Sequence, residues 1–433
     1  MLGEYRRYAE GSRETEEDPG GEGQKAANFA RVKEYKEVFL RKAYGRFKKL
    51  HSSVVIKHEG EGNDHLRKFL DTHNYEEFLQ NNVQWLKDYA LFKCLKVKCS
   101  ELAWNEWEEK YVQRDPDALG DLAVEAAEEI EYIYFVQYTF EYQWQSLKSY
   151  ANKKGVKIIG DIPIFVAYDS CDTWANRVIF ALDEQNAPLG TAGVPPDYFS
   201  PTGQNWGNPL YAWDVLAATD YAWWKLRFKQ ALERFDILRL DHFRGFEAYW
   251  EVPAQATSAK EGRWMKGPGK RFFERLAGEF GPLPLIAEDL GTITPEVKTL
   301  KAICGFPGMR VIQFSPLAEG EPKKLKESVC YSGTHDNDTL LGWYLSQGYE
   351  YNSSMEQVKK TIEELYQGDG AWVILPLQDV LGLDSKARMN APGTIKGNWL
   401  WRVEKESLTR EVSAELRYIA QKYGRGKKAI ESD

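Results

Sequence analysis

Four acidic side chains follow short apolar runs in the second half of the chain, at the points where buried strands would end. They are Asp161, Asp241, Glu288 and Asp336. Transfer or hydrolysis at a glycosidic bond needs two carboxyl groups across that bond, one ionised and one protonated. In FDILRLDHFRGF, Arg239 lies two residues before Asp241, so on a strand both side chains point the same way. The cation favours an ionised Asp241, whereas Glu288, after the apolar run LPLIA, would keep its proton longer.

Each of these residues also has a purely structural interpretation. Asp161 could sit in a turn or cap the N-terminus of a helix. Arg239 and Asp241 could form an ion pair that only stabilises the strand, and Glu288 with Asp289 could cap a following helix. Because such groups recur at four separate strand ends, the set as a whole favours catalysis.

His335 and Asp336 are adjacent, and together they could clamp substrate hydroxyls or simply satisfy each other in a loop. A His-Asp pair also suggests a metal. However, the stretch from His335 to Asp338 has neither the i, i+4 histidine pair of a zinc protease nor the spacing of an EF-hand. We therefore expect no metal site here.

The composition favours a globular protein that handles neither nucleic acid nor membranes. The formal net charge is −8, whereas nucleic-acid binding predicts a basic face. No apolar run approaches the roughly 18 residues of a membrane span, and the N-terminus has no apolar signal region. The five scattered cysteines suit reduced thiols in the cytoplasm. The 15 Trp and 24 Tyr fit either an aromatic core or a groove for the flat faces of sugars.

The chain divides into three parts by pattern. Residues 1–27 are polar and rich in Gly and Glu, which predicts a loose segment. Residues 28–150 carry apolar positions at helical spacing, which predicts a mostly helical insertion subdomain. Residues 151–433 alternate apolar runs with helical stretches, as parallel βαβ units do, and contain a Gly- and Pro-rich loop at 190–214. The apolar runs are 156–167, 235–243, 283–291, 308–316, 328–338 and 371–382.

This alternation favours an α/β fold of the (β/α)8 TIM-barrel type, in which the active site is built at the C-terminal ends of the strands. A doubly wound sheet would also alternate, but no GxGxxG follows any run, and the acidic residues are spread over several strand ends. About six strands are expected where eight close a barrel, because the first 150 residues show no convincing strand pair. We therefore expect an incomplete barrel with helical insertions.

Six motifs together resemble the 4-α-glucanotransferase family, glycoside hydrolase family 77, which is the amylomaltase or disproportionating-enzyme branch of the α-amylase clan. The resemblance extends from about residue 28 to near the C-terminus, and the motifs stand in the family's order. They are GDIPIFVAYDSCDTWAN, GVPPDYFSPTGQNWGNPLYAWD, FDILRLDHFRGFEAYWEVPA, LIAEDLGTITPEV, SGTHDNDTLLGW and ILPLQDVLGLDSKARMNAPGTIKGNWLWR.

The resemblance implies a role for each catalytic candidate. Asp241 matches the family's nucleophile, Glu288 its general acid/base and Asp336 its transition-state stabiliser. Further matching positions would support these three or contact the substrate. They are Asp161, Arg239, His242, His335 and Asn390.

The second motif resembles the family's mobile loop, which arches over the sugar chain. Tyr198 and Phe199 would lie at its tip, with Gln204 and Trp206 facing the subsites. Exposed aromatic side chains would have a function in such a loop, because it can close over the active site and exclude water.

The implied reaction is a retaining transfer between α-1,4-glucans or malto-oligosaccharides, without a cofactor or metal. Asp241 would attack the anomeric carbon while Glu288 protonates the leaving oxygen; Glu288 would then activate the 4-hydroxyl of a second glucan. The two carboxyl groups are expected roughly 5–5.5 Å apart. The oligomeric state stays open.

One part of the family pattern is not seen in this sequence. The family's chain begins with a strand resembling GILLHPTSLPG, a second strand and a substrate-contacting stretch, which would supply barrel strands one and two and part of the donor subsites. Unpaired strand edges are a liability. We therefore expect the isolated chain to be poorly stable and weakly active or inactive.

Two alternatives to glucan transfer stay open. One is an α-glucan hydrolase of the same clan, and the other is a truncated remnant that binds glucans without changing them. The expected location is the cytoplasm, or a plastid if the source is a plant, although no transit peptide is visible.

Overall fold

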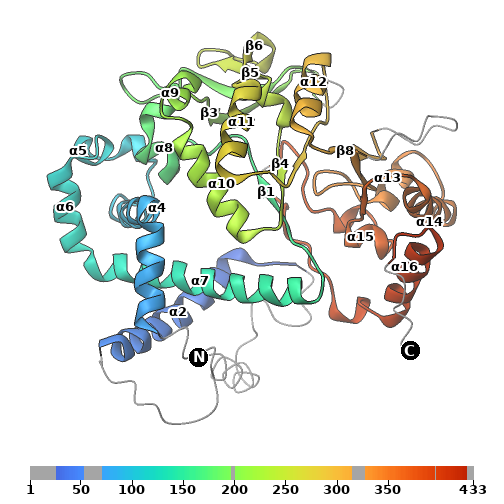
Figure 1. The fold of residues 1–433 in the computed structure, drawn as a ribbon, viewed down its shortest axis with the longest axis horizontal. Helices are drawn as coiled ribbons and strands as arrows, with labels where there is room; N and C mark the ends of the chain where they lie inside the picture. The colour runs from blue at the N-terminus through green and yellow to red at the C-terminus, as the bar shows by residue number, and fades with distance from the viewer. Residues whose placement is uncertain (1–25, 53–70, 197–199, 315–326, 395, 427–433) are drawn as a thin grey trace. The chain divides into compact units, whose positions relative to one another are not determined.

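The computed structural model describes residues 26–52, 71–196, 200–314, 327–394 and 396–426. These residues form two compact units (Figure 1). Unit 1 comprises residues 36–285 and 294–304, and unit 2 comprises the remaining described residues. The predicted loose segment 1–27 lies outside the described residues except for its last two.

A group of helices precedes the first strand of unit 1. They are α2 (Phe29–Ser52), α4 (Thr72–Lys98), α5 (Glu109–Val112), α6 (Pro116–Glu125) and α7 (Ala127–Lys153). The start of α6 follows from its sequence, because Asp115 accepts a hydrogen bond from Ala118 N at 2.9 Å and Pro116 occupies the first helical position. Helices α4 and α7 pack against each other (Figure 1).

Aromatic side chains hold these helices together. Tyr132, Phe135 and Tyr138 recur every three residues on α7, which places them on one buried face. They pack against aromatic and aliphatic residues of α2 and α4, namely Tyr44, Phe47, Phe78 and Leu86. A second cluster contains the buried Trp104, Trp107 and Trp174. Much of the aromatic content therefore serves as core in this unit.

The first two parallel strands lie in unit 1, joined through α10 (Ala222–Arg234). Strand β1 (Ile159–Ile162) pairs with β4 (Ile237–Leu240), and Asp161 stands opposite Arg239. Strand β4 is next bonded to the segment entering β7, because Leu238 N donates to Pro284 O at 2.9 Å. The alternation along β4 buries Leu238 and Leu240 and turns Arg239 to the other face.

Unit 1 also contains a four-stranded antiparallel sheet, which was not predicted from the sequence. Its order is β3-β2-β5-β6. The strands are β2 (Gly190–Val194), β3 (Gln204–Pro209), β5 (Ala248–Pro253) and β6 (Arg263–Lys266). Strands β2 and β3 lie within the segment 190–214 that the sequence predicts as a loop. Position 193 requires glycine because the backbones of β2 and β3 approach each other closely there. A Cβ on Gly193 would meet Gln204 O at 2.2 Å.

Unit 2 contains further parallel strands. Strand β7 (Leu285–Ala287) begins at the unit boundary and is followed by β8 (Gly308–Val311), β9 (Ser328–Tyr331) and β10 (Trp372–Ile374). Each neighbouring pair from β7 to β10 is parallel. In the described residues the parallel sheet has the order β1-β4-β7-β8-β9-β10. This confirms the six predicted strands and the prediction of an incomplete barrel of the (β/α)8 type.

The remaining helices lie between or after these strands. In unit 1 they are α8 (Cys171–Ala175), α9 (Trp213–Ala218), α11 (Gly269–Phe280) and α12 (Pro295–Cys304); in unit 2 they are α13 (Leu340–Ser346), α14 (Tyr351–Gln367), α15 (Leu377–Val380) and α16 (Arg410–Lys422). Short 3-10 turns are η2 (Trp104–Glu106), η3 (Arg177–Ile179), η4 (Phe243–Phe246), η5 (Ala259–Glu261), η6 (Ser385–Ala387) and η7 (Lys405–Ser407).

Candidate active site

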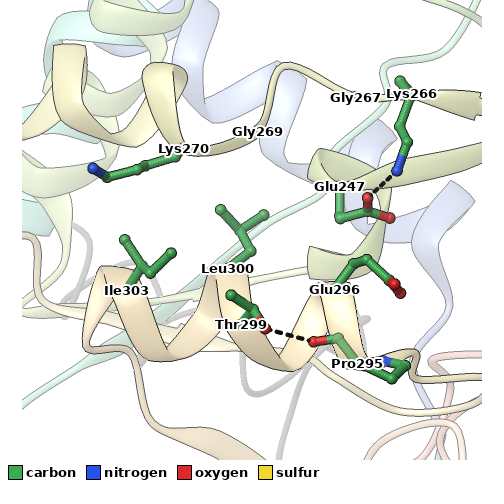
Figure 2. Close-up of a pocket in the computed structure, with 10 residues that line it drawn as sticks. All are labelled: Glu247, Lys266, Gly267, Gly269, Lys270, Pro295, Glu296, Thr299, Leu300 and Ile303. Atoms are coloured by element: carbon green, nitrogen blue, oxygen red, sulfur yellow. Dashed lines mark hydrogen bonds and ion pairs between the residues drawn. The ribbon is translucent and has the colours of Figure 1, made fainter.

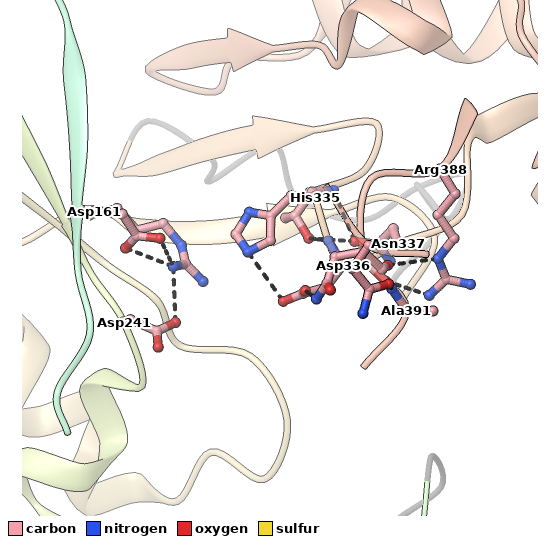
Figure 3. A network of polar contacts seen from close by, with 11 residues as sticks. Asp161, Asp241, His335, Asp336, Asn337, Arg388 and Ala391 are labelled. Carbon is pink, nitrogen blue, oxygen red and sulfur yellow. Dashed lines mark hydrogen bonds and ion pairs between the residues drawn. The ribbon is translucent and has the colours of Figure 1, made fainter. Parts of the chain in front are cut away.

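Arg239 lies between two carboxylates where β1 and β4 end. Its Nη1 donates to Asp161 Oδ1 and Oδ2 at 2.9 and 2.7 Å, and it lies 2.9 Å from Asp241 Oδ1 (Figure 3). The Arg239 side chain is 13% exposed, whereas those of Asp161 and Asp241 are 44% and 39% exposed. The cation is thus shielded from water while both acids reach solvent, and hydrogen bonds to a guanidinium are among the strong ones in proteins. Asp161 lies inside β1, so it does not cap a helix.

His242 follows Asp241 in a left-handed backbone conformation, with φ of 50°. Few residues other than glycine adopt this conformation, so the backbone is strained directly beside the acid. The imidazole ring meets Trp206 of β3 edge to face, with 5.0 Å between ring centroids. Burial lowers the pKa of His242 to about 4, although the charge of Asp241 acts in the opposite direction. The imidazole is therefore neutral at pH 7.

Gln204 and Trp206 lie two residues apart on β3, so their side chains share one face of the strand. Trp206 Nε1 donates to Gln204 Oε1 at 3.1 Å, and Trp206 is 38% exposed. An exposed indole anchored by its N–H suits packing against the apolar face of a sugar. Tyr198 and Phe199 lie outside the described residues.

Glu288 is the first residue after β7, at the strand end where the sequence predicted it. The three strand residues before it are all buried, and Glu288 itself is half-buried. Its Oε1 accepts a hydrogen bond from Leu290 N at 2.9 Å, within the turn that leaves the strand. The neighbouring Asp289 accepts from Met309 N of β8 at 2.7 Å. This acid therefore links two strands of unit 2, while Glu288 occupies the strand end.

Asp336 is held by residues from the last motif. Asn390 Nδ2 donates to Asp336 Oδ1 at 2.6 Å, and Asn390 N donates to His335 O at 3.0 Å. His335 Nε2 lies 3.4 Å from Asp336 Oδ2 (Figure 3). The structure therefore brings together three of the predicted residues, His335, Asp336 and Asn390, although the last is 54 positions from Asp336.

Arg388 was not predicted from the sequence, yet it completes this group. Its Nη2 donates to the backbone oxygen of Asp336 at 2.6 Å, and its Nε donates to Asn390 O at 2.9 Å (Figure 3). The amino-acid sequence offers one indication of this role, because Arg388 lies two residues before Asn390 in the stretch ARMN. A planar guanidinium can satisfy two such carbonyls at once, which an ammonium does less well.

The turn that carries Asp336 is tied by its own polar side chains. Asn337 Oδ1 accepts from Thr334 N at 2.9 Å and from Thr334 Oγ1 at 2.8 Å, and Asn337 is only 8% exposed. Trp399 packs on the His335 ring with 5.1 Å between centroids. Trp399 is not among the site residues predicted from the sequence either, although GNWLW belongs to the last motif. His335 and Asp336 thus sit on a rigid support with an aromatic neighbour.

A separate pocket of about 380 Å³ opens in unit 1 beside α12 (Figure 2). Lys266 and Glu247 form an ion pair at its edge, and Thr299 donates to Pro295 O at 2.9 Å. Leu300 contributes to its apolar wall. None of its lining residues is a predicted site residue, so this pocket and the acidic groups are distinct features.

Two kinds of feature are absent from the described residues. Within them, no group of three or more His, Cys, Asp or Glu side chains is arranged to hold a metal ion. Among the described helices, none has the length and apolar character needed to cross a membrane.

Comparisons with known proteins agree with the motifs. The family model described as 4-alpha-glucanotransferase matches residues 5–409. The chain is 44% identical over 369 residues to a 4-alpha-glucanotransferase of Thermus thermophilus, covering 80% of this chain and 74% of the relative. It is 40% identical over 409 residues to one of Synechocystis, covering 90% and 78%. The structure resembles an amylomaltase from Streptococcus agalactiae, solved with acarbose, with a TM-score of 0.85 and 34% identity over 97% of this chain and 85% of that one. This chain therefore belongs to the 4-alpha-glucanotransferase family.

Proposed function

We propose that this chain is a 4-α-glucanotransferase, which cleaves an α-1,4-glucan and transfers the released segment to the 4-hydroxyl of another glucan. The observation that carries the proposal is the Arg239 guanidinium held between Asp161 and Asp241 at adjacent strand ends. Membership of the family supports the same reaction. Malto-oligosaccharides and longer α-1,4-glucans are the proposed substrates.

Asp241 is the proposed nucleophile and Glu288 the proposed general acid. The Asp241 carboxylate is paired with Arg239 and partly exposed, so a substrate can reach it. It attacks the anomeric carbon and forms a glycosyl ester, while the glycosidic C–O bond breaks and Glu288 gives its proton to the leaving oxygen. The first glucan departs with a new 4-hydroxyl group.

The second step reverses the first with a different sugar. Glu288, now ionised, takes the proton of the acceptor's 4-hydroxyl, and that oxygen attacks the same carbon and releases Asp241. Two inversions at one carbon retain the α-linkage. This chemistry requires the two carboxyl groups on opposite sides of one bond, about 5–5.5 Å apart, which stays a prediction.

Asp336 is proposed to bind hydroxyls of the reacting sugar as positive charge develops on it. Support for this role comes from the hydrogen bonds that restrict the carboxylate: Asn390 holds Oδ1, and Arg388 holds the backbone oxygen of the same residue. A side chain fixed before the substrate arrives loses little freedom during the reaction, so its contacts favour the transition state.

Transfer rather than hydrolysis requires that a sugar outcompete water at the glycosyl ester. We assign this task to the segment 190–214, on which Trp206 and Gln204 offer an aromatic face and an amide. A sugar packed on these groups displaces water from the ester.

Two further proposals concern the rest of the chain. The helices from 28 to 150 form an insertion subdomain beside the barrel core of 151–433. The enzyme acts in the cytoplasm, which the five cysteines support because all of them are free thiols.

Incubation with maltotriose tests the proposed reaction, with product lengths resolved by chromatography. A transferase yields glucose together with a ladder of longer chains, even at a low rate. Asp241→Asn should abolish the ladder, with a loss of about 10⁴-fold or more. Products no longer than maltotriose would identify a hydrolase, and an unchanged substrate that still binds would identify an inactive remnant; either result would overturn the proposal.

A further inference from the structure

Asp379 is a buried carboxylate that bonds to both ends of the segment carrying His335 and Asp336. It lies on α15 and is 2% exposed. Ser332 Oγ donates to Asp379 Oδ2 at 2.6 Å, and Leu340 N donates to Asp379 Oδ1 at 2.7 Å. Ser332 directly follows β9 and Leu340 begins α13, so one carboxylate joins the end of a strand to the start of the next helix.

Burying this group is costly, which argues that its hydrogen bonds serve a purpose. Burial raises the pKa of Asp379 to about 6, and the nearby charge of Asp338 acts in the same direction, while the bonds from Leu340 and Ser332 oppose the rise. At pH 7 the carboxylate is therefore mostly ionised and accepts both bonds. A buried charge without such partners would destabilise the fold.

A second set of contacts holds the same segment. Asp338 Oδ1 accepts from Thr339 N at 2.8 Å, and its Oδ2 accepts from Ser385 Oγ at 2.7 Å. Gln313 Nε2 donates to Asp338 O at 2.9 Å. Packing is tight here too, because a Cβ on Gly342 would meet Ser385 Oγ at 2.2 Å. The segment from 332 to 340 is thus anchored at its two ends and in its second half.

We propose that Asp379 is a positioning residue for the proposed transfer reaction. It fixes the segment from Ser332 to Leu340 so that Asp336 meets the reacting sugar in a productive position. Asp379 itself does not touch substrate, since it is buried and both of its oxygens are already engaged. The inference rests on the proposed role of Asp336, and its test separates the two.

Two variants of Asp379 distinguish positioning from simple support of the fold. Asp379→Ala removes the acceptor for Leu340 N and Ser332 Oγ; a shift of about 1 Å at Asp336 would lower kcat roughly 100-fold. The KM for maltotriose should stay within about threefold, because ground-state binding relies on other groups. Asp379→Asn keeps an acceptor for Leu340 N and can donate to Ser332 Oγ, so its kcat should stay within about tenfold of the wild type.

Ser354→Ala is the matched control, because Ser354 is fully buried in the same unit, on α14. It should change kcat by less than about twofold per folded molecule. Asp379→Ala with a wild-type kcat per folded molecule would overturn the inference. If Asp379→Ala does not fold, Ser332→Ala decides, because it deletes one bond and adds no charge; we expect a kcat three- to tenfold lower at about the same KM, and a wild-type kcat would refute the role.

Hydrogen exchange supplies a readout that needs no activity. The Leu340 amide should exchange at least tenfold faster in Asp379→Ala than in the wild type or Ser354→Ala, because its acceptor is gone. Unchanged exchange in a folded Asp379→Ala would contradict the proposed anchoring. A wild-type chain that forms no maltotriose ladder would instead contradict the proposed function, and the exchange measurement would still decide the anchoring.

Discussion

Arg239 Nη1 lies 2.9 Å from Asp241 Oδ1, and the two residues are separated by a single position on the sequence. The contact exists because alternate side chains of a strand share a face, so β4 delivers both groups to the same side. The same nitrogen also lies 2.7 Å from Asp161 Oδ2 on the neighbouring strand. One shielded cation therefore bridges two acids, and the Asp241 side chain stays 39% exposed.

Replacing Arg239 tests whether this geometry matters beyond its charge. Arg239→Lys keeps the positive charge but moves it, because the shorter ammonium side chain cannot occupy the position of Nη1 between Asp161 and Asp241; kcat on maltotriose should therefore fall about 10- to 100-fold. Arg263→Lys is the control: Arg263 is 67% exposed and pairs with Glu251 at 2.7 Å, so the exchange keeps the charge at the surface and should leave kcat unchanged. An Arg239→Lys enzyme with a wild-type kcat would show that charge alone suffices.

Asn390 offers a graded test of the Asp336 support. Asn390→Ala removes the 2.6 Å bond to Asp336, and loss of a hydrogen bond to a charged group predicts a kcat lower by about 10- to 100-fold. Asn390→Asp should be worse, because it places a second carboxylate against Asp336. The exposed Asn352→Ala on α14 provides a control with no expected change. Wild-type activity of both the Ala and the Asp variant would contradict the proposed support of Asp336 by Asn390.

His242 should make the fold sensitive to acid. Its pKa is about 4 in the native chain and about 6.5 when unfolded, so between these values the unfolded chain takes up a proton that the native chain does not. Stability contributed by His242 is therefore complete above about pH 6.5 and falls as the pH drops towards 4, by at most about 3 kcal/mol.

The corresponding experiment compares His242→Asn with the wild type, because Asn tolerates the left-handed backbone found there. Melting temperatures between pH 7.5 and 4.5 should fall less for the variant than for the wild type. Parallel curves for the two proteins would mean that His242 takes up a proton as readily in the folded chain as in the unfolded chain.

Gly193 should be essential to the pairing of β2 with β3. In Gly193→Ala the new Cβ would meet the backbone oxygen of Gln204, so the strands must separate and Trp206 must move. We expect a melting temperature lower by several degrees and a KM for maltotriose raised about tenfold. Gly278→Ala in α11 has no atom within 4 Å of the added Cβ, and it should raise stability by up to about 1 kcal/mol. A Gly193→Ala protein that matches the wild type in both measurements would contradict the close approach.

The parallel strands could be predicted because each lies in a short run of apolar residues, and these runs alternate with helical stretches along the chain. Leu238 and Leu240 are fully buried in β4, as their spacing indicates, and Glu288 directly follows the buried residues of β7. The antiparallel sheet could not be predicted in the same way. Strands β2 (GTAGV) and β3 (QNWGNP) are rich in Gly, Asn and Pro, which signal turns when only neighbours along the chain are considered.

The positions of Asp241 and Glu288 directly after parallel strands, the helices of residues 28–150 and the family motifs could all be recognised in the amino-acid sequence. These properties depend on residues close together in the chain. Three other features become visible only in the folded chain: Arg388 holds the backbone of Asp336, Asp379 joins Ser332 to Leu340, and burial makes His242 neutral. Such contacts join residues tens of positions apart, and they form only where the packing of the whole unit repays the loss of chain entropy and the burial of charge.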